Sequence, residues 1–384
     1  KRIKRIKRIK RIKRIKRIKR IKRIKRIKRI KRIKRIKRIK RIKRIKMKTR
    51  ILTIVALQLF LILNSCSSSD NESVNIVDKE EIQTDFIAEN QGDFVITTDN
   101  LVYNVNIKSD RIYPYIEQID AEGKTTVLKT LDFTFPKLVF SQSGELLLIS
   151  PNKTNDSDKI FRFENNFQQL NPFYVMQAES SPFAKLARLG IICNANDGSY
   201  FVFDYTSNNI KRIIPELGTD VFIAGSGKEE IKDGDGLEAG FGGITKILFH
   251  KNIFYLIDNN YKSNGTSDGI SYIRKLEFLN NKWTVTTLIS TPGVNVYKDL
   301  AFDANNNLHV VVSEKGIYKL NLQNNDLSLY KDWSVKIRKD NRQYYTNFKT
   351  VTGLKFKGNV MYLATSDLLI KISDYQSKFD ALGK

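Results

Sequence analysis

The chain has 384 residues and a formal net charge of +28, but this charge is concentrated at one end. Residues 1–46 contain 31 of the 68 basic residues, and the remaining chain carries 37 basic against 40 acidic residues, a net charge of −3. This balance disfavours a nucleic-acid partner. With only two histidines and two cysteines, a zinc or iron centre is not expected.

Residues 1–46 repeat Lys-Arg-Ile fifteen times and end in Lys46. A three-residue period moves isoleucine around a helix of about 3.6 residues per turn, so no continuous apolar face forms. A cationic arm for nucleic acid or anionic lipid is one interpretation. We favour an artefact that precedes a true start at Met47, as if a short DNA repeat had been translated, and do not expect the tract to belong to the folded domain.

Residues 47–65 have the pattern of a secretory signal peptide. Lys48 and Arg50 form a basic start, and the apolar run from Ile51 to Leu63 is thirteen residues long. A run of this length is too short for a membrane-spanning helix.

The segment Leu63-Asn64-Ser65-Cys66 resembles the cleavage site of a bacterial lipoprotein signal, although Asn64 is an unusual middle residue. The resemblance implies cleavage before Cys66, lipidation of Cys66, and anchoring to the outer membrane or cell surface through acyl chains. An ordinary signal peptide is the alternative. Residues 66–73 are polar and predict a flexible tether, which resembles those of surface lipoproteins from Bacteroidetes-type bacteria.

After the tether, turn residues recur at nearly constant spacing, each directly before a β-rich run. The intervals are 52, 54, 54, 55 and 52 residues between Gly92, Gly144, Gly198, Asn252, Asn307 and Asn359. A fixed period of about 50 residues indicates one supersecondary unit repeated along the chain.

Each unit contains about four short strands and few helix signals. Six such units predict an all-β fold over residues 74–384, a six-bladed β-propeller of four-stranded antiparallel blades. The last unit lacks a fourth strand, while Val74–Val77 is a strand without a unit of its own. We therefore expect this N-terminal strand to pair with the outer edge of the final blade and close the ring.

Residues 224–276 resemble an NHL repeat. The similarity lies in Ala224-Gly225, the run from Asp233 to Phe241, the strand Ile253–Asp258 and the segment Tyr272–Leu276, with Gly242-Gly243 where the family pattern has a proline. The third unit matches partly, and the other four keep only the strand pattern. Propellers of this type include lyases, lactonases, sensors and binding modules, so the resemblance implies a fold and not an activity.

Binding residues are expected on the face with the longer loops, because the opposite face has tight turns with little room. Asp204 and Asp258 end second strands there, and with Asp233 and Asp235 they could hold calcium through oxygen ligands. The alternative is that these carboxylates form hydrogen bonds within loops and turns. We expect no cofactor, with calcium as the one alternative.

The segment Ser334–Thr352 is a basic loop with interleaved aromatic residues. Arg342, Tyr344 and Tyr345 could grip an anionic glycan or stack on sugar rings; the alternative is that the aromatic side chains pack on the sixth blade.

No catalytic residue is indicated. Cys193 lies in an apolar run that favours a buried, inert thiol, and His250 and His309 lie near tight turns, solvated or packed on strands. The favoured function is a non-catalytic surface lipoprotein that binds a protein or glycan. The alternative is a calcium-dependent hydrolase or lyase with its site at the propeller pore.

Overall fold

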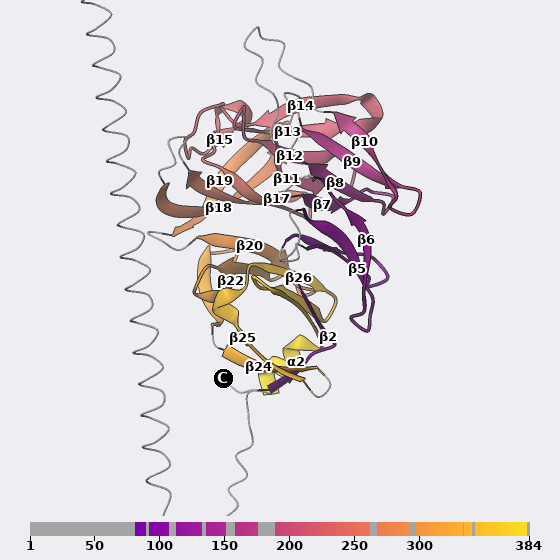
Figure 1. Ribbon diagram of the computed structural model, residues 1–384. Coiled ribbons are helices and arrows are strands. Elements are labelled where there is room, and N and C mark those ends of the chain that lie inside the picture. Colours follow the sequence, from indigo (N-terminus) through magenta and orange to yellow (C-terminus); the bar gives the residue numbers. More distant parts are fainter. Residues whose placement is uncertain are drawn as a thin grey trace, which may run out of the picture. The chain divides into compact units, whose positions relative to one another are not determined.

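The computed structural model describes residues 81–89, 92–106, 113–132, 136–150, 158–175, 189–261, 267–291, 296–332, 334–339 and 342–381 (Figure 1). Residues 1–46, the signal segment 47–65, Cys66, the tether 66–73 and Val74–Val77 lie outside this part of the chain. Among the residues described, no helix has the length and apolar character needed to cross a membrane.

The described strands form six antiparallel blades in a propeller ring, which confirms the predicted all-β fold. In each blade the strands follow one another from the central channel outwards. Blade 1 has β3 (Phe94–Ile96), β4 (Val102–Asn106), β5 (Tyr115–Ile119) and β6 (Thr125–Thr130). Blade 2 has β7 (Lys137–Phe140), β8 (Leu146–Ser150), β9 (Lys159–Glu164) and β10 (Gln169–Val175).

The remaining blades repeat this order. Blade 3 has β11 (Leu189–Asn194), β12 (Tyr200–Asp204), β13 (Asn209–Ile214) and β14 (Thr219–Ala224), with the turn η1 (Pro215–Leu217). Blade 4 has β16 (Ile244–His250), β17 (Ile253–Tyr261), β18 (Ser267–Leu279) and β19 (Lys282–Thr291), and β15 (Gly234–Asp235), followed by η2 (Gly236–Glu238), adds a short fifth strand to β19. Blade 5 has β20 (Tyr297–Phe302), β21 (Leu308–Val312), β22 (Gly316–Asn321) and β23 (Asp326–Lys331).

The core of the protein lies between adjacent blades. Second strands such as β12 and β21 are buried at every position because both of their faces are covered. The buried side chains form six clusters, and each cluster joins residues of two neighbouring blades. Every blade therefore depends on both of its neighbours for burial of its apolar surface.

In blade 1 the predicted position of the turn between the first and second strands is wrong. Phe94–Ile96 is the inner strand of that blade rather than its second strand, and the turn follows it at Asn100, which has φ 67°. Gly144, Gly198 and Asn252 lie in left-handed turn positions as expected. Because first and second strands are both short and apolar, their order in blade 1 could not be read from the pattern of residues.

In the last two blades the left-handed residues are Asn306 and Gly358, each one position before the residue that the spacing indicated, Asn307 or Asn359. The predicted turns are therefore present, but the strained backbone position within them differs. Only a residue that tolerates positive φ fits there, and asparagine and glycine both do.

An N-terminal strand closes the ring, as predicted, but a different one. Blade 6 consists of β26 (Gly353–Lys357), β27 (Val360–Ala364) and β28 (Leu368–Ser373), and its outer strand is β2 (Phe86–Glu89). The register pairs Phe86 with Lys371 and Glu89 with Leu368. The edge assigned above to Val74–Val77 is thus already occupied by β2.

The burial of Phe86 explains why β2 takes this edge. Phe86 is 1% exposed and packs in a cluster shared by blades 6 and 1, with its ring 6.4 Å from that of Tyr362. The neighbouring turn carries Gly123 at φ +84°, and a Cβ at that position would lie 2.4 Å from the Cβ of Phe86. Next to β2, Asp85 Oδ2 accepts hydrogen bonds from the backbone N–H of Ser373 (2.8 Å) and from its hydroxyl (2.6 Å).

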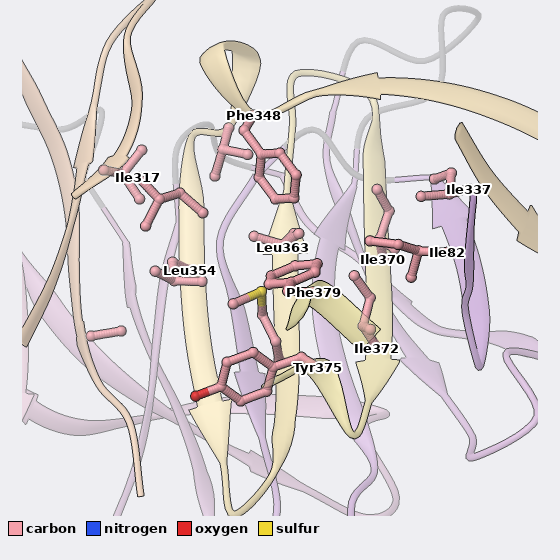
Figure 2. Close-up of a cluster of buried hydrophobic side chains, with 14 residues drawn as sticks. Ile82, Ile317, Ile337, Phe348, Leu354, Leu363, Ile370, Ile372, Tyr375 and Phe379 are labelled. Carbon is pink, nitrogen blue, oxygen red and sulfur yellow. The ribbon is translucent and has the colours of Figure 1, made fainter. Parts of the chain in front are cut away.

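The segment predicted as a loop at Ser334–Thr352 is instead a β-hairpin. It consists of β24 (Ser334–Lys339), β25 (Arg342–Asn347) and the turn η3 (Phe348–Thr350), and β1 (Glu81–Gln83) pairs with β24 in parallel. Together with helix α2 (Tyr375–Ala381), this small sheet covers blade 6. Figure 2 shows Ile82, Ile337, Phe348 and Phe379 gathered around Leu363 and Ile370.

Ring closure gives a first testable prediction. Because the Phe86 ring is fully buried at the closing seam, Phe86→Ala should lower the free energy of unfolding by about 3–5 kcal/mol, measured by denaturant titration. As a control, Leu329→Ala removes a side chain that is 52% exposed on β23 and should change it by less than about 0.5 kcal/mol. Equal effects of the two substitutions would contradict closure by β2.

His309 is a buried histidine between blades 5 and 6, not a solvated one. Its side chain is fully buried, its Nε2 lies 3.0 Å from Asp303 Oδ2, and its ring packs on Phe356 and Tyr330. Its Nδ1 has no hydrogen-bond partner among the described residues. Burial lowers the pKa of His309 below its ordinary value, although Asp303 opposes this shift.

A lowered histidine pKa makes stability depend on pH. In the unfolded chain the His309 imidazole binds a proton near pH 6.5, whereas in the folded protein it does so only at lower pH. The contribution of His309 to the free energy of unfolding is therefore fully present above about pH 6.5 and is lost as the pH drops below it. The unfolding free energy of wild type should therefore decrease more steeply between about pH 7 and pH 5 than that of His309→Gln, which cannot titrate. If the unfolding free energies of wild type and His309→Gln change in parallel with pH, His309 does not contribute to the pH dependence of stability.

Candidate functional site

The first two candidate carboxylates hold loops in place. Asp204 Oδ2 lies 2.9 Å from Lys211 Nζ, both side chains being 2% exposed, and the same carboxylate accepts hydrogen bonds from Thr206 and Ser207. Asp258 is fully buried; its Oδ2 lies 2.7 Å from Arg274 Nη1, and its Oδ1 accepts from the backbone of Gly242 and Gly243.

Asp233 and Asp235 are also engaged. Asp233 Oδ1 lies 3.0 Å from Arg274 Nη2 and accepts from the Thr287 hydroxyl at 2.8 Å. Asp235 Oδ2 lies 2.5 Å from Lys282 Nζ. Arg274 therefore brings Asp233 and Asp258 together, whereas Asp235 pairs elsewhere in blade 4 and Asp204 lies in blade 3.

These carboxylates do not fit calcium. Each of the four already faces a lysine or arginine, and a cation among these groups would meet like charge. Within the described ranges, no group of three or more histidine, cysteine, aspartate or glutamate side chains could hold a metal ion.

The aromatic residues of the hairpin are placed on β25. Tyr344 is half-buried and packs against the apolar cluster of blades 5 and 6, which is the alternative stated above. Arg342 and Tyr345 lie on the same strand, and their side chains lie outside the part of the chain that the structure describes.

A cluster of charged side chains that the sequence reasoning did not identify lines the central channel. It consists of Asp93, Lys137, Lys246, Asp299 and Lys355, contributed by the inner ends of blades 1, 2, 4, 5 and 6. With Lys298 and Thr352 they surround a cavity of about 350 Å³ on the face where the long loops enter the inner strands. We call this group the channel cluster.

The two carboxylates of the channel cluster also bind neighbouring blades to each other. Asp93 Oδ2 accepts from the backbone N–H of Leu138 (3.0 Å), and Asp299 Oδ2 accepts from that of Leu354 (2.8 Å). Asp299 Oδ1 lies 2.5 Å from Lys246 Nζ. One aspartate thus joins blades 1 and 2, and the other joins blades 5 and 6.

Lys355, like Lys137, has no ion-pair partner in the channel cluster among the described residues. It makes no hydrogen bond or ion pair with another described residue, and its Nζ lies 5.2 Å from the centre of the Phe94 ring. Burial and the adjacent Lys246 lower the pKa of Lys355. Burial also opposes the charged form of Lys246, but Asp299 outweighs it and raises the pKa of Lys246.

The channel cluster therefore carries an excess of positive charge, with three lysines against two aspartates. Burial disfavours ionisation of Asp93, yet Lys137 and Lys355 lower its pKa. A ligand with an anionic group would balance the excess positive charge of this site.

The expectation that the tight-turn face has little room is wrong at the opposite end of the channel. A cavity of about 440 Å³ opens there, shares Lys246 and Lys355 with the channel cluster, and is lined by phenylalanines. These are Phe140, Phe249, Phe302 and Phe356. The channel is thus charged at the loop face and aromatic at the tight-turn face.

A sequence signal for the channel cluster did exist. Lysine or aspartate stands beside or within five of the six first strands: Asp93 precedes β3, Lys137 begins β7, and Lys246, Asp299 and Lys355 are the third residues of β16, β20 and β26. A charge in an apolar run indicates a position that faces a cavity. The sequence, however, identified an apolar run as an inner strand only where a clear turn followed it.

No protein-family model matches this chain, and no curated protein sequence matches it. Solved structures do share its fold. An auxiliary nutrient-binding protein from Bacteroides thetaiotaomicron has a TM-score of 0.52 at 10% identity over 73% of this chain and 68% of that one. A second protein from the same organism, of unknown function, has a TM-score of 0.50 at 11% identity over 76% and 74%.

A putative gluconolactonase is similar to the same degree, with a TM-score of 0.50 and 12% identity over 77% of this chain and 92% of that one. At these identities the similarity establishes the propeller fold, which hosts both binding proteins and enzymes.

Proposed function

We propose that this protein is a non-catalytic binding propeller that holds an anionic group of its ligand, such as the carboxylate of an acidic glycan, in the central channel. The observation that carries this proposal is Lys355, a cation without an ion-pair partner among the described residues, in the lining of a cavity of about 350 Å³. A cavity of this size lies within the range of about 300–1,000 Å³ found for small-ligand sites.

The electrostatics of the channel favour this ligand. An ammonium group that is surrounded by protein and lacks a partner is costly, because burial disfavours its charged form. A bound anion would restore the charged form and would match the three lysines better than a neutral group. Asp93 and Asp299 hold the surrounding backbone, so the walls of the site are formed before the ligand arrives.

The channel offers little for catalysis. The thiol of Cys193 lies near Lys246 and Lys355, and burial raises its pKa to about 11, so it remains protonated at neutral pH. His309 is engaged between blades by Asp303, Phe356 and Tyr330 and is not among the residues that line the channel-cluster cavity. Binding is therefore the function that this geometry supports best.

The proposed contact is tested with Lys355→Met, which keeps most of the side-chain volume and removes the charge. Loss of a hydrogen bond to a charged group costs about 1.5–3 kcal/mol, so affinity for an acidic probe such as glucuronate should fall by roughly tenfold or more. The measurement is calorimetric titration, supported by an array of acidic and neutral glycans.

The matched control is Lys251→Met, which removes an exposed lysine in a turn. It should leave glucuronate binding unchanged. If wild type does not distinguish acidic from neutral glycans, or if Lys355→Met binds glucuronate as well as wild type does, the proposed site is wrong.

We also propose that lipid chains on Cys66 anchor the propeller to the outer membrane or cell surface. The support is the signal-like segment 47–65 and the polar tether 66–73. Cys66→Ser should move the protein from the membrane fraction to the soluble fraction, whereas Cys193→Ser, at the other cysteine, should not. Membrane retention of Cys66→Ser would refute the lipid anchor.

A further inference from the structure

A second, separate cleft lies on the tight-turn face between blades 3 and 4. Phe201 and Phe254, each 2% exposed and with ring centroids 4.0 Å apart, lie beneath its base. The accessible aromatic surface therefore belongs to Phe278 and Trp283. Trp283 and Phe278 form an aromatic wall with ring centroids 5.2 Å apart. Phe278 is 53% exposed near the end of β18, where it pairs with Trp283 of β19.

Polar side chains from both blades surround these rings. Arg212 Nη2 lies 2.5 Å from Asp197 Oδ2, and Arg212 Nε donates to the Ser199 hydroxyl at 3.1 Å. Asp197 Oδ1 accepts from the backbone N–H of Ser199 at 3.0 Å and from its hydroxyl. These contacts fix the carboxylate and the guanidinium side by side at the edge of the aromatic surface.

The rim keeps hydrogen-bonding capacity for a ligand. Arg212 Nη1 and the side-chain amides of Asn196 and Asn252 have no hydrogen-bond partner among the described residues. Asp197 Oδ2 accepts only from Arg212 there and can accept again. Donors and acceptors are therefore offered around an apolar surface.

We propose that this cleft binds one ring of a neutral saccharide. A pyranose ring has apolar C–H faces and a rim of hydroxyls, which matches aromatic rings bordered by a carboxylate, a guanidinium and two amides. Adjacent hydroxyls can donate to Asp197 and accept from Arg212. The volume of about 310 Å³ is at the lower end of the range for ligand sites and suits a single ring or a disaccharide.

Other ligand classes fit less well. An aliphatic chain would cover the aromatic surface but would leave the rim groups without partners after their desolvation. An anion would meet the carboxylate of Asp197, and a cation would meet Arg212, because the pair carries no net charge. A neutral molecule with many hydroxyls makes use of both parts of the site.

The inference does not rest on the proposed function of the central channel. Phe249 lines the cleft and the aromatic cavity at the tight-turn end of the channel, but not the cavity of the channel cluster. Lys355 is absent from the cleft, and Trp283 and Asp197 are absent from the channel cluster. Loss of one binding activity can therefore be measured with the other intact.

The test uses the methyl glycosides of glucose, galactose, mannose and N-acetylglucosamine, with saturation-transfer NMR and calorimetric titration on the full protein. At least one glycoside should bind saturably. Phe278→Ala, which removes an exposed ring, and Asp197→Asn, which keeps the shape of the side chain, should each weaken that binding by about tenfold.

Two controls separate the cleft from other surfaces. Phe222→Ala removes an equally accessible aromatic ring, 47% exposed on β14 and outside the cleft, and should have no effect. Lys355→Met should also leave glycoside binding unchanged. The proposal is overturned if none of the four glycosides binds, or if binding persists unchanged in both cleft variants while their melting temperatures equal that of wild type.

Discussion

Pairing of β2 with β28 is the contact on which the rest of the structure depends. Each blade buries its apolar residues only against its two neighbours, so an open ring would expose both faces of the seam between blades 6 and 1. The strand that prevents this comes from the opposite end of the described chain, and residues preceding it, in β1, also extend the hairpin sheet over blade 6. One nine-residue segment, Glu81–Glu89, therefore secures two sheets.

Closure also creates the channel. Once the ring is complete, the inner strands face one another across a narrow space, and whatever side chains stand at their ends must share it. Asp93 and Asp299 satisfy backbone N–H groups of the next blade and offset part of the lysine charge. Buried charges are tolerated when they are paired and hydrogen-bonded, and Lys137 and Lys355 are the members of the channel cluster that have no such partner among the described residues.

The two faces of the propeller differ in chemistry for a simple geometric reason. Charged residues occur where first strands begin, and aromatic residues occur where first strands end at the tight turns. Between blades 3 and 4 the aromatic character reaches the surface beside the Asp197–Arg212 pair. By contrast, the acidic residues of the long loops, such as Asp204 and Asp258, are used to hold those loops through Lys211 and Arg274.

The sequence by itself determined the repeated unit, because alternating strands and turn residues such as Gly144, Gly198 and Asn252 are local features with local causes. It also indicated that an N-terminal strand closes the ring. Only the tertiary structure decided that this strand is Phe86–Glu89, since the choice depends on the fit of Phe86 against Tyr362 and Gly123. The sequence showed lysine or aspartate in or beside most first strands, but not that Asp93 and Lys355 share one cavity, because they are far apart in the chain and blades 1 and 6 meet only when the ring has closed.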